Sequence, residues 1–257
     1  MAMRAPVLKD QIAIVTGGAK GLGAAVAAEL DSEGALVVVT DLDGAGARKT
    51  AEGLSRGESA VCDVRDDDAV ADLVANVVAK HGRLDIMVAN AGIATVTSIS
   101  DMTMDIWHSV LDVNLHGVFS SVRHAGRAMA ATGGGSIITM ASITGFAGSP
   151  LIAHYAAAKA AVISLTKTAA VELRGHGVRV NAICPGFIGT DLVLDRATQF
   201  EQGLGIDDFG AVINQAQGRL GEVGDVAPLA AFLASDRSRF SNGSTFVVDG
   251  GMSASLV

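Results

Sequence analysis

A tyrosine and a lysine four positions apart are the residues whose types and spacing most directly suggest chemistry. Tyr155 is the only tyrosine in the 257 residues, and Lys159 follows it in the run Tyr-Ala-Ala-Ala-Lys. The stretch 152–174 is rich in alanine and contains no glycine or proline, so we predict a helix that places both side chains on one face. Lowering a tyrosine pKa from about 10 to about 7 requires roughly 4 kcal/mol. A cation about 4 Å away supplies about that much at an effective dielectric near 20. The pair therefore predicts a proton donor and acceptor near neutral pH, although such a pair also arises by chance and the rest of the chain must decide.

Two further polar residues precede this pair. Ser142 follows the apolar run 136–140 at the expected carboxyl end of a strand, where open α/β sheets bind ligands. A serine hydrolase is excluded because Met140 and Thr144 stand where a nucleophile elbow needs glycine. Asn114 lies within 103–132, which we predict to be one long helix. Asparagine is a poor residue there, and its side chain either has a function or simply faces solvent.

A glycine-rich segment follows the first apolar run. Residues 12–15 read as a buried strand, followed by Thr16-Gly-Gly-Ala-Lys-Gly-Leu-Gly23 and an alanine-rich helical stretch to Glu33. A strand, a glycine turn and a helix in this order bring backbone N–H groups and a helix N-terminus close to a pyrophosphate. The segment therefore predicts a dinucleotide site.

The residue after the second expected strand, 35–40, indicates which dinucleotide. Asp41 stands eighteen residues after Gly23. An acid at this point accepts hydrogen bonds from ribose hydroxyls and repels a 2′-phosphate, and no lysine or arginine occurs in 41–47. Two observations leave alternatives open: an aspartate can simply begin a turn, and Lys20 inside the glycine turn favours the phosphorylated cofactor. We expect NAD to be preferred over NADP.

Apolar runs and helical stretches alternate along the whole chain. This alternation predicts an α/β fold of the Rossmann type, a doubly wound, predominantly parallel seven-stranded sheet with helices on both faces. The remaining strands are expected at 59–62, 84–89, 136–140, 178–183 and 245–248. No repeat or linker is visible, so we expect a single domain over 1–257. Its segment 191–224 lacks a regular period and is expected to be a loop and helix region that covers the substrate.

Composition excludes several classes of protein. A net charge of −8 without a lysine and arginine cluster argues against a nucleic-acid partner. No apolar run reaches the ~18 residues of a membrane span, and the first eleven residues lack the apolar core of a signal peptide. Cys62 and Cys184 fit buried thiols of a cytoplasmic protein. The six histidines form no ligand motif, so no metal site is expected.

In order and spacing, these segments resemble the short-chain dehydrogenase/reductase family in its ordinary form, over essentially the whole chain. One departure is Ala89, where many members carry a second asparagine. The matching motifs are Thr16-Gly-x-x-x-Gly21-x-Gly23, Asp41, Asp63, Asn90-Ala-Gly92, Asn114, Ser142, Tyr155-x-x-x-Lys159 and Pro185-Gly186-x-x-x-Thr190.

The resemblance implies catalytic roles. Tyr155 would be the general acid in ketone reduction and the general base in alcohol oxidation. Lys159 would lower the pKa of Tyr155, helped by the positive charge of the oxidised nicotinamide, and would hold the nicotinamide ribose. Ser142 would hydrogen-bond the substrate oxygen, and Asn114 would hold a water that relays protons towards Lys159.

The resemblance also implies how the cofactor is held. Asp63 and the Val64 backbone would contact the adenine, while Thr190 and the backbone near Ile188 would bind the carboxamide. The full expected cofactor-binding set is Thr16, Gly17, Lys20, Gly21, Leu22, Gly23, Asp41, Leu42, Asp63, Val64, Asn90, Ala91, Gly92, Tyr155, Lys159, Pro185, Gly186, Ile188 and Thr190.

These features predict an NAD(H)-dependent oxidoreductase that interconverts a secondary alcohol and a ketone. The alternatives are an NADP-dependent 3-oxoacyl-thioester reductase and a non-catalytic dinucleotide-binding protein, a class that typically loses the tyrosine or the lysine. Helices 103–132 and 152–174 carry small and apolar residues on more than one face, so we expect a homo-oligomer, as a tetramer. The expected substrate pocket is mostly apolar and comprises Ile143, Thr144, Phe146, His154, Phe187 and Leu192.

Overall fold

A parallel sheet of seven strands lies at the centre of the computed structural model, which describes residues 6–254. Its strand order is β3-β2-β1-β4-β5-β6-β7, and every neighbouring pair is parallel. The order reverses between β1 and β4, which places a ligand crevice at the carboxyl ends of these strands. The predicted fold class is confirmed. The strands are β1 (Ile12–Thr16), β2 (Leu36–Asp41), β3 (Gly57–Val61), β4 (Ile86–Ala89), β5 (Gly135–Met140), β6 (Val178–Pro185) and β7 (Thr245–Val248).

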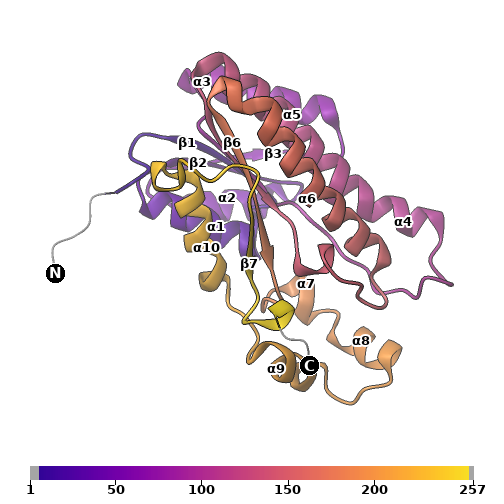
Figure 1. The fold of residues 1–257 in the computed structure, drawn as a ribbon. Coiled ribbons are helices and arrows are strands. Elements are labelled where there is room, and N and C mark those ends of the chain that lie inside the picture. The colour runs from indigo at the N-terminus through magenta and orange to yellow at the C-terminus, as the bar shows by residue number, and fades with distance from the viewer. Residues whose placement is uncertain (1–5, 255–257) are drawn as a thin grey trace, which may run out of the picture.

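Helices cover both faces of the sheet (Figure 1). One face carries α1 (Gly21–Ser32), α2 (Gly44–Glu52) and α10 (Val223–Ala234). The other carries α3 (Asp67–His81), α4 (Met104–Leu111), α5 (Gly117–Thr132) and α6 (Ala153–Leu173). Three short helices lie beyond the carboxyl edge: α7 (Asp191–Leu194), α8 (Ala197–Leu204) and α9 (Phe209–Gln217). Single 3-10 turns occupy Ile143–Gly145, Arg174–His176, Asp236–Ser238 and Met252–Ala254.

The apolar run of β1 feeds two hydrophobic cores. Ile12 and Ile14 belong to the core under α3, α5 and α6, whereas Ala13 and Val15 belong to the core under α1 and α10. All residues of the strand are buried. Successive side chains of a strand point to opposite faces, so a strand covered on both sides is apolar throughout. No helix within the described residues is long and apolar enough to cross a bilayer.

The helix expected over 103–132 is interrupted by a wider turn. The chain forms α4, then a π-helical turn at Asp112–His116, then α5. Asn114 lies inside that turn and is completely buried, so its solvent-facing alternative is wrong. π-helical turns inside α-helices often occur at functional sites, and the partners of this side chain, described below, account for the turn.

Other element boundaries differ from the sequence-based expectations. β3 lies two residues earlier at its start than 59–62, β4 begins at Ile86 rather than at residue 84, and β6 continues through Pro185. The segment 191–224 contains three short helices, α7, α8 and α9, whose bounds the hydrophobic pattern did not indicate. Its apolar residues Phe200, Phe209 and Ile213 form a small core of their own with Ile152, so they follow neither the period of the sheet nor that of a long helix.

Candidate active site

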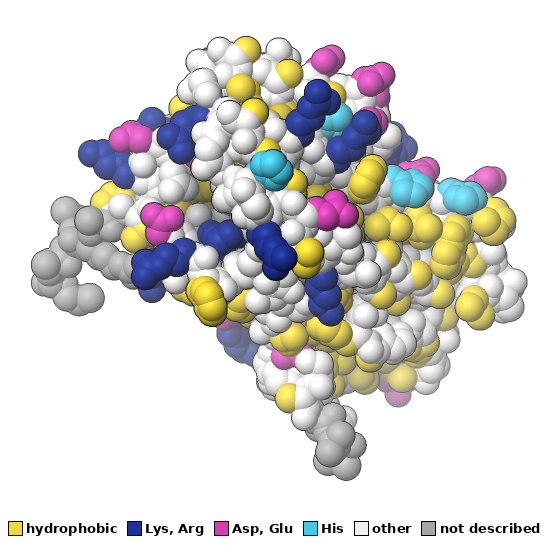
Figure 2. Space-filling model, turned by 45° about the horizontal axis from the view of Figure 1, so that its top comes forward, with side chains coloured by type: hydrophobic (Ala, Val, Ile, Leu, Met, Phe, Trp, Pro, Cys, Tyr) yellow, Lys and Arg dark blue, Asp and Glu magenta, His cyan; other side chains and the backbone are white. Residues whose placement is uncertain are grey.

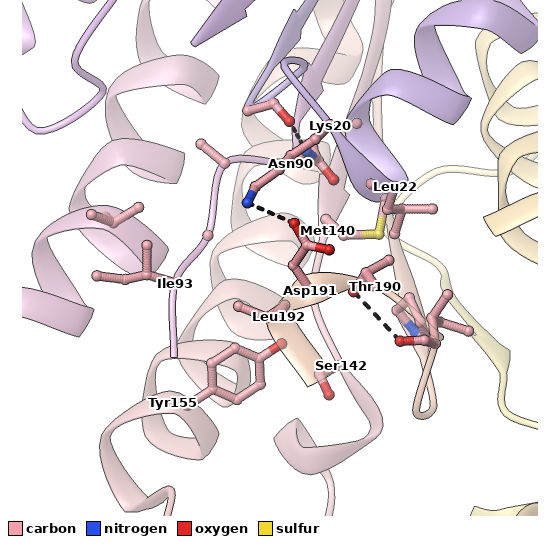
Figure 3. A pocket seen from close by; sticks show the side chains of 18 of the residues that line it. Lys20, Leu22, Asn90, Ile93, Met140, Ser142, Tyr155, Thr190, Asp191 and Leu192 are labelled. Carbon is pink, nitrogen blue, oxygen red and sulfur yellow. Dashed lines mark hydrogen bonds and ion pairs between the residues drawn. The ribbon is translucent and has the colours of Figure 1, made fainter. Parts of the chain in front are cut away.

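A cavity of about 560 Å³ opens at the carboxyl ends of the central strands. It extends from the glycine turn after β1 to the first turn of α6, so it brings the expected cofactor site and Tyr155 into one space (Figure 3). Its walls contain every residue expected to bind the cofactor except Thr16, together with Ser142. The residues that the sequence reasoning missed are Cys62, Arg65, Ile93, Val113, Met140, Ala141, Asp191, Val193, Asp195 and Arg196.

The glycine turn has no room for side chains. Gly17 has a φ of +66°, and a Cβ there would lie 2.7 Å from the Ala91 Cα. A Cβ on Gly23 would lie 2.1 Å from the Gly17 carbonyl oxygen. These positions therefore require glycine. They leave the amino end of α1 bare beside the cavity, a cradle that suits a dinucleotide pyrophosphate.

Thr16 and Asn90 hold the turn in this shape. The Thr16 Oγ1 accepts hydrogen bonds from the backbone N–H groups of Asn90 and Ala91, at 3.0 and 3.1 Å. The Asn90 Nδ2 donates to the carbonyls of Thr16 and Gly17, at 2.9 and 3.0 Å. Thr16 therefore supports the glycine turn on the side away from the cavity. Its bonds and those of Asn90 join the motif after β1 to the motif after β4.

Asp41 ends β2 and faces the same cavity. Its Oδ2 accepts from the Ala19 N–H at 3.1 Å, and its Oδ1 accepts from the Asp43 N–H at 3.0 Å. The Lys20 Nζ forms an exposed ion pair with the Asp191 Oδ2 at 2.7 Å. This ion pair joins the glycine turn to α7 at the mouth of the cavity, so the ammonium is directed towards α7 (Figure 3).

Asp63 lines the cavity with an arginine that the sequence reasoning did not consider. The Arg65 guanidinium binds the Asp63 carboxylate, with Nη2 at 2.6 Å from Oδ2. This contact holds the pKa of Asp63 below its ordinary value. The sequence signal that could have indicated Arg65 is its position two residues after Asp63, the acid expected to contact the adenine.

Lys159 is buried against the face of the Tyr155 ring. Its Nζ donates to the Met140 carbonyl at 2.7 Å and lies 5.4 Å from the centre of the ring. Burial lowers the pKa of Lys159 to about 8. Burial raises the pKa of Tyr155 to about 12, and the neighbouring Ser142 side chain only partly opposes that rise. In the protein without its cofactor, burial therefore decides the pKa of this phenol, and a lowering by Lys159 together with the oxidised nicotinamide stays a prediction.

Ser142 and Asn114 occupy different places around this centre. The Ser142 Oγ accepts from the Thr144 N–H at 3.2 Å and faces the cavity. Asn114 is not part of the wall: its Oδ1 accepts from the Ile93 N–H and its Nδ2 donates to the Ile93 carbonyl, both at 2.8 Å. A Cβ on Gly92 would lie 3.5 Å from the Asn114 Oδ1 and 3.7 Å from the Lys159 Nζ. Gly92 therefore lies between the two polar groups.

Comparison with known proteins agrees with this geometry. The family model described as "Enoyl-(Acyl carrier protein) reductase" matches residues 17–253. A cis-4-hydroxycyclohexanecarboxylate dehydrogenase from Sinomonas cyclohexanicum is 40% identical over 251 residues, covering 95% of this chain and 97% of the relative. The 3-oxoacyl-[acyl-carrier-protein] reductase FabG of Salmonella typhimurium is 37% identical over 245 residues, covering 95% and 98%. The crystal structure of levodione reductase superposes with a TM-score of 0.91 at 32% identity, covering 97% and 100%.

The chain belongs to the short-chain dehydrogenase/reductase family. It is an oxidoreductase of that type, and members of this family use NAD or NADP. The glycine cradle, the acid after β2 and the small residues after β4 fit such a cofactor, since together they leave space along one wall of the cavity.

The substrate end of this short-chain dehydrogenase differs from the sequence-based expectation. Of the six expected pocket residues only Leu192 lines the cavity. Ile143 and His154 are buried outside its walls, and the Thr144 hydroxyl is buried without a hydrogen-bond partner. Phe146 is 52% exposed, and Phe187 packs edge-on against Phe209 with ring centres 5.5 Å apart. Within residues 6–254, no cluster of three or more histidine, cysteine or acidic side chains could hold a metal ion.

Proposed function

We propose that this protein is an NAD(H)-dependent oxidoreductase that interconverts a secondary alcohol and a ketone. The observation that supports it most is the single cavity that joins the glycine cradle to Tyr155, Ser142 and Lys159. When bound there, the nicotinamide would accept a hydride from the alcohol carbon or return it to the carbonyl carbon. The alternative of a non-catalytic dinucleotide-binding protein is disfavoured because both the tyrosine and the lysine face this space.

The chain's own residues would handle the proton and the substrate oxygen. Tyr155 takes the proton of the alcohol in oxidation and gives it to the developing alkoxide in reduction. The Ser142 Oγ accepts from Thr144, so its own hydrogen is available to donate to the substrate oxygen. Lys159, with a pKa of about 8, can exchange a proton near neutral pH. Asn114 holds the Ile93 backbone through two hydrogen bonds. A water that passes protons from Asn114 towards Lys159 would lie next to Gly92, which is close to both side chains.

The preference for NAD over NADP is part of this proposal. The Asp41 carboxylate is anchored by two backbone N–H groups and would repel a 2′-phosphate. Lys20 is the feature that favours NADP, and its ion pair with Asp191 directs its charge away from that point.

Replacing Asp41 by Ala together with Leu42 by Arg should reverse the cofactor preference. Removing the carboxylate and adding a guanidinium should raise the ratio of kcat/KM for NADP over NAD about 100-fold, since a charge-assisted hydrogen bond contributes about 1.5–3 kcal/mol. Steady-state kinetics with both cofactors measures this. The matched control is Lys20→Ala, which should leave the preference for NAD in place. A wild type that prefers NADP by more than a few-fold would show that Lys20 decides the preference.

The substrate class is proposed to be a secondary alcohol on an apolar ring. Beside Ser142 and Tyr155, the cavity wall also contains the apolar side chains of Ile93, Leu192 and Val193. The relative that acts on cis-4-hydroxycyclohexanecarboxylate supports a cyclic substrate. The test is a screen of cyclic and open-chain secondary alcohols with each cofactor, followed by the absorbance of the reduced nicotinamide. Activity on open-chain alcohols alone would contradict the cyclic class.

A 3-oxoacyl-thioester reductase is the second candidate, because the FabG relative and the family description both concern acyl carrier protein substrates. Asp41 argues against it. Reduction of acetoacetyl-coenzyme A with NADPH at a higher kcat/KM than any cyclic ketone with NADH would favour this candidate.

The segment 191–224 is proposed to cover the bound substrate. Arg196 ties it to the loop after β4, with Nε donating to the Ala94 carbonyl at 2.7 Å. The Lys20–Asp191 ion pair ties it to the glycine turn. These two ties hold α7 over the cavity between the cofactor end and the substrate end.

We also propose that the protein assembles as a homotetramer and functions in the cytoplasm. Met104 on α4, Phe119 on α5 and Val171 on α6 are 62%, 50% and 60% exposed. Hydrophobic side chains gather in Figure 2 on the side where α4 lies in Figure 1. Exposed apolar surface of this kind marks a contact between proteins.

Light scattering at micromolar concentration should therefore give four times the chain mass of 26.0 kDa. Replacing Phe119 by Glu should shift the assembly to smaller species, because the carboxylate would lose its water in the contact. A wild-type protein that scatters as a single chain would rule the assembly out.

A further inference from the structure

His154 is completely buried next to Tyr155, and both of its ring nitrogens are hydrogen-bonded. The Nδ1 lies 2.9 Å from the backbone nitrogen of Tyr155. The Nε2 lies 2.6 Å from the Thr95 Oγ1. The ring therefore connects the first turn of α6 to the loop between β4 and α4. Nothing in the chemistry described above uses it.

These two contacts determine where the ring carries its proton. A backbone N–H can only donate, so the Nδ1 that receives the Tyr155 N–H must be unprotonated. In the neutral ring the hydrogen is then on Nε2, which donates to the Thr95 hydroxyl. Both bonds exist together only in this neutral tautomer. A doubly protonated ring would direct a second hydrogen at the Tyr155 N–H.

The bond to Tyr155 meets a need of the helix. The first N–H groups of any helix lack partners within it, and Ile152 at the amino end of α6 provides no side-chain cap. His154 supplies the missing acceptor for Tyr155. The other end of the ring rests on a loop that is itself fixed, through the Asn114 bonds to Ile93 and the Arg196 bond to Ala94.

We propose that His154 is a positioning residue for Tyr155, whose neutral ring fixes the tyrosine backbone against the Thr95 loop and whose protonation releases it. The inference rests on the proposed role of Tyr155 as the general acid and base. It assigns His154 no contact with substrate, since the ring lies outside the cavity wall. Displacing a catalytic group by about 1 Å can cost about 100-fold in rate, so an anchor at the backbone of Tyr155 has a measurable effect.

The surroundings of the ring favour its neutral form. Burial lowers the pKa of His154 below its ordinary value of 6.5, and the Ile152 carbonyl only partly opposes this. No ion pair joins His154 to another residue in 6–254. The ionisable side chains on the elements packed around it are Tyr155 and Lys159 on α6, the exposed Asp105 and His108 on α4, and Arg196 and Glu201, which bond the Ala94 carbonyl and the Phe209 N–H. The ring is therefore neutral at pH 7 and protonates only in more acidic solution.

Ketone reduction in acidic solution isolates this group. Tyr155 and Lys159 are both protonated there, so neither should limit the rate as the pH falls. With cyclohexanone and NADH, the wild-type kcat should fall below pH 6.5 while circular dichroism shows a folded protein. His154→Asn places an amide oxygen near the position of Nδ1 and cannot ionise. It should keep most of the neutral-pH kcat and lose the acid limb.

Two more variants separate the two bonds. His154→Leu removes both contacts and should lower kcat by roughly ten-fold or more at pH 7 with little change in KM for NADH, since misplacement of the general acid affects turnover. Thr95→Val leaves the Tyr155 bond and should give a smaller loss. The matched control is His176→Asn on the exposed turn after α6, which should behave as wild type at every pH. Where Tyr155→Phe has lost its turnover, an acid limb that persists in His154→Asn, or an unchanged kcat in His154→Leu, would overturn the proposal.

Nitrogen NMR of the cofactor-free protein tests the same inference without turnover. The His154 ring should show a protonated Nε2 and an unprotonated Nδ1 at pH 7, and the Tyr155 amide signal should move when that ring titrates. If the catalytic role of Tyr155 were wrong, the NMR result would stand and the kcat effects would be absent. A ring with its hydrogen on Nδ1 would contradict the geometry itself.

Discussion

Replacing Tyr155 by Phe should lower the turnover of secondary alcohol oxidation and ketone reduction by ~100-fold or more, the usual scale for losing general acid–base catalysis. The change keeps the ring that packs beside Ile152 in the small core and removes only the hydroxyl. Thermal unfolding and the dissociation constant for NADH should therefore stay close to wild type. Steady-state kinetics, fluorescence titration and calorimetry measure these three quantities. Wild-type turnover in this variant would mean that the tyrosine is structural and that Ser142 needs a different role.

The same residue allows an unusually direct pH measurement, because the chain has one tyrosine. Burial raises the pKa of Tyr155 to about 12, so the folded cofactor-free protein should show no phenolate absorbance at pH 10.5. Alcohol oxidation should nevertheless rise with pH through a lower apparent pKa, and this limb should vanish in Tyr155→Phe. The difference between the phenol pKa of the cofactor-free protein and the apparent pKa of alcohol oxidation measures how far the positive charge of the bound cofactor lowers the Tyr155 pKa. A phenolate midpoint near 10 in the cofactor-free protein would show that burial does not control the group.

The cofactor end of the site could be predicted because contiguous residues determine it. The spacing of the glycines between Thr16 and Gly23 reflects close contacts between backbone segments, because a Cβ at Gly17 or Gly23 would clash with backbone atoms. Asp41 and Asn90 directly follow strands, so their place at the carboxyl edge follows from the sheet. Tyr155 and Lys159 share a face through helical spacing alone.

The substrate end could not be predicted in the same way. Consecutive helical residues are about 100° apart, so a Tyr155 that faces the cavity forces His154 into the interior. Proximity in sequence therefore misassigned His154 to the pocket. Phe187 was misassigned because its place depends on α9, whose Phe209 receives it. Val193 and Arg196 line the cavity because of the way α7 packs over it. The hydrophobic pattern of the sequence does not predict that packing.

Replacing Lys159 by Met should affect both activity and the pH dependence of stability. Turnover should fall about 100-fold, the scale expected when an electrostatic group at the reacting centre is lost, and NADH should bind more weakly if the ammonium holds the ribose. The variant also leaves the buried Met140 carbonyl without its donor, which costs stability at every pH. Only the pH-dependent part of the change reports on the charge.

The sign of that part follows from the lowered pKa. Burial takes the pKa of Lys159 from 10.5 to about 8, so between these values the unfolded chain binds a proton that the native protein does not. The free energy of unfolding of the wild type then rises with pH across this window, by at most about 1.4 kcal/mol per unit from this group. The rise of Tyr155 to about 12 acts in the opposite direction only above pH 10. Below pH 8 the buried ammonium destabilises the native protein by its full amount.

Urea unfolding of the cofactor-free wild type and Lys159→Met at pH 7, 8, 9 and 10 therefore provides the test. From pH 8 to pH 10, the free energy of unfolding of the wild type should rise relative to that of Lys159→Met by at most about 2–3 kcal/mol. The hydrogen bond that the variant lacks lowers its stability by the same amount at every pH and does not change this slope. The matched control is Lys167→Met, an exposed lysine on the same helix, whose difference from wild type should not change over this range. A constant difference for Lys159→Met as well would show that its ammonium keeps an ordinary pKa in the folded protein. The proton exchange near neutral pH proposed for this lysine would then have no basis, while the assignment of Tyr155 as the general acid and base would still depend on Tyr155→Phe.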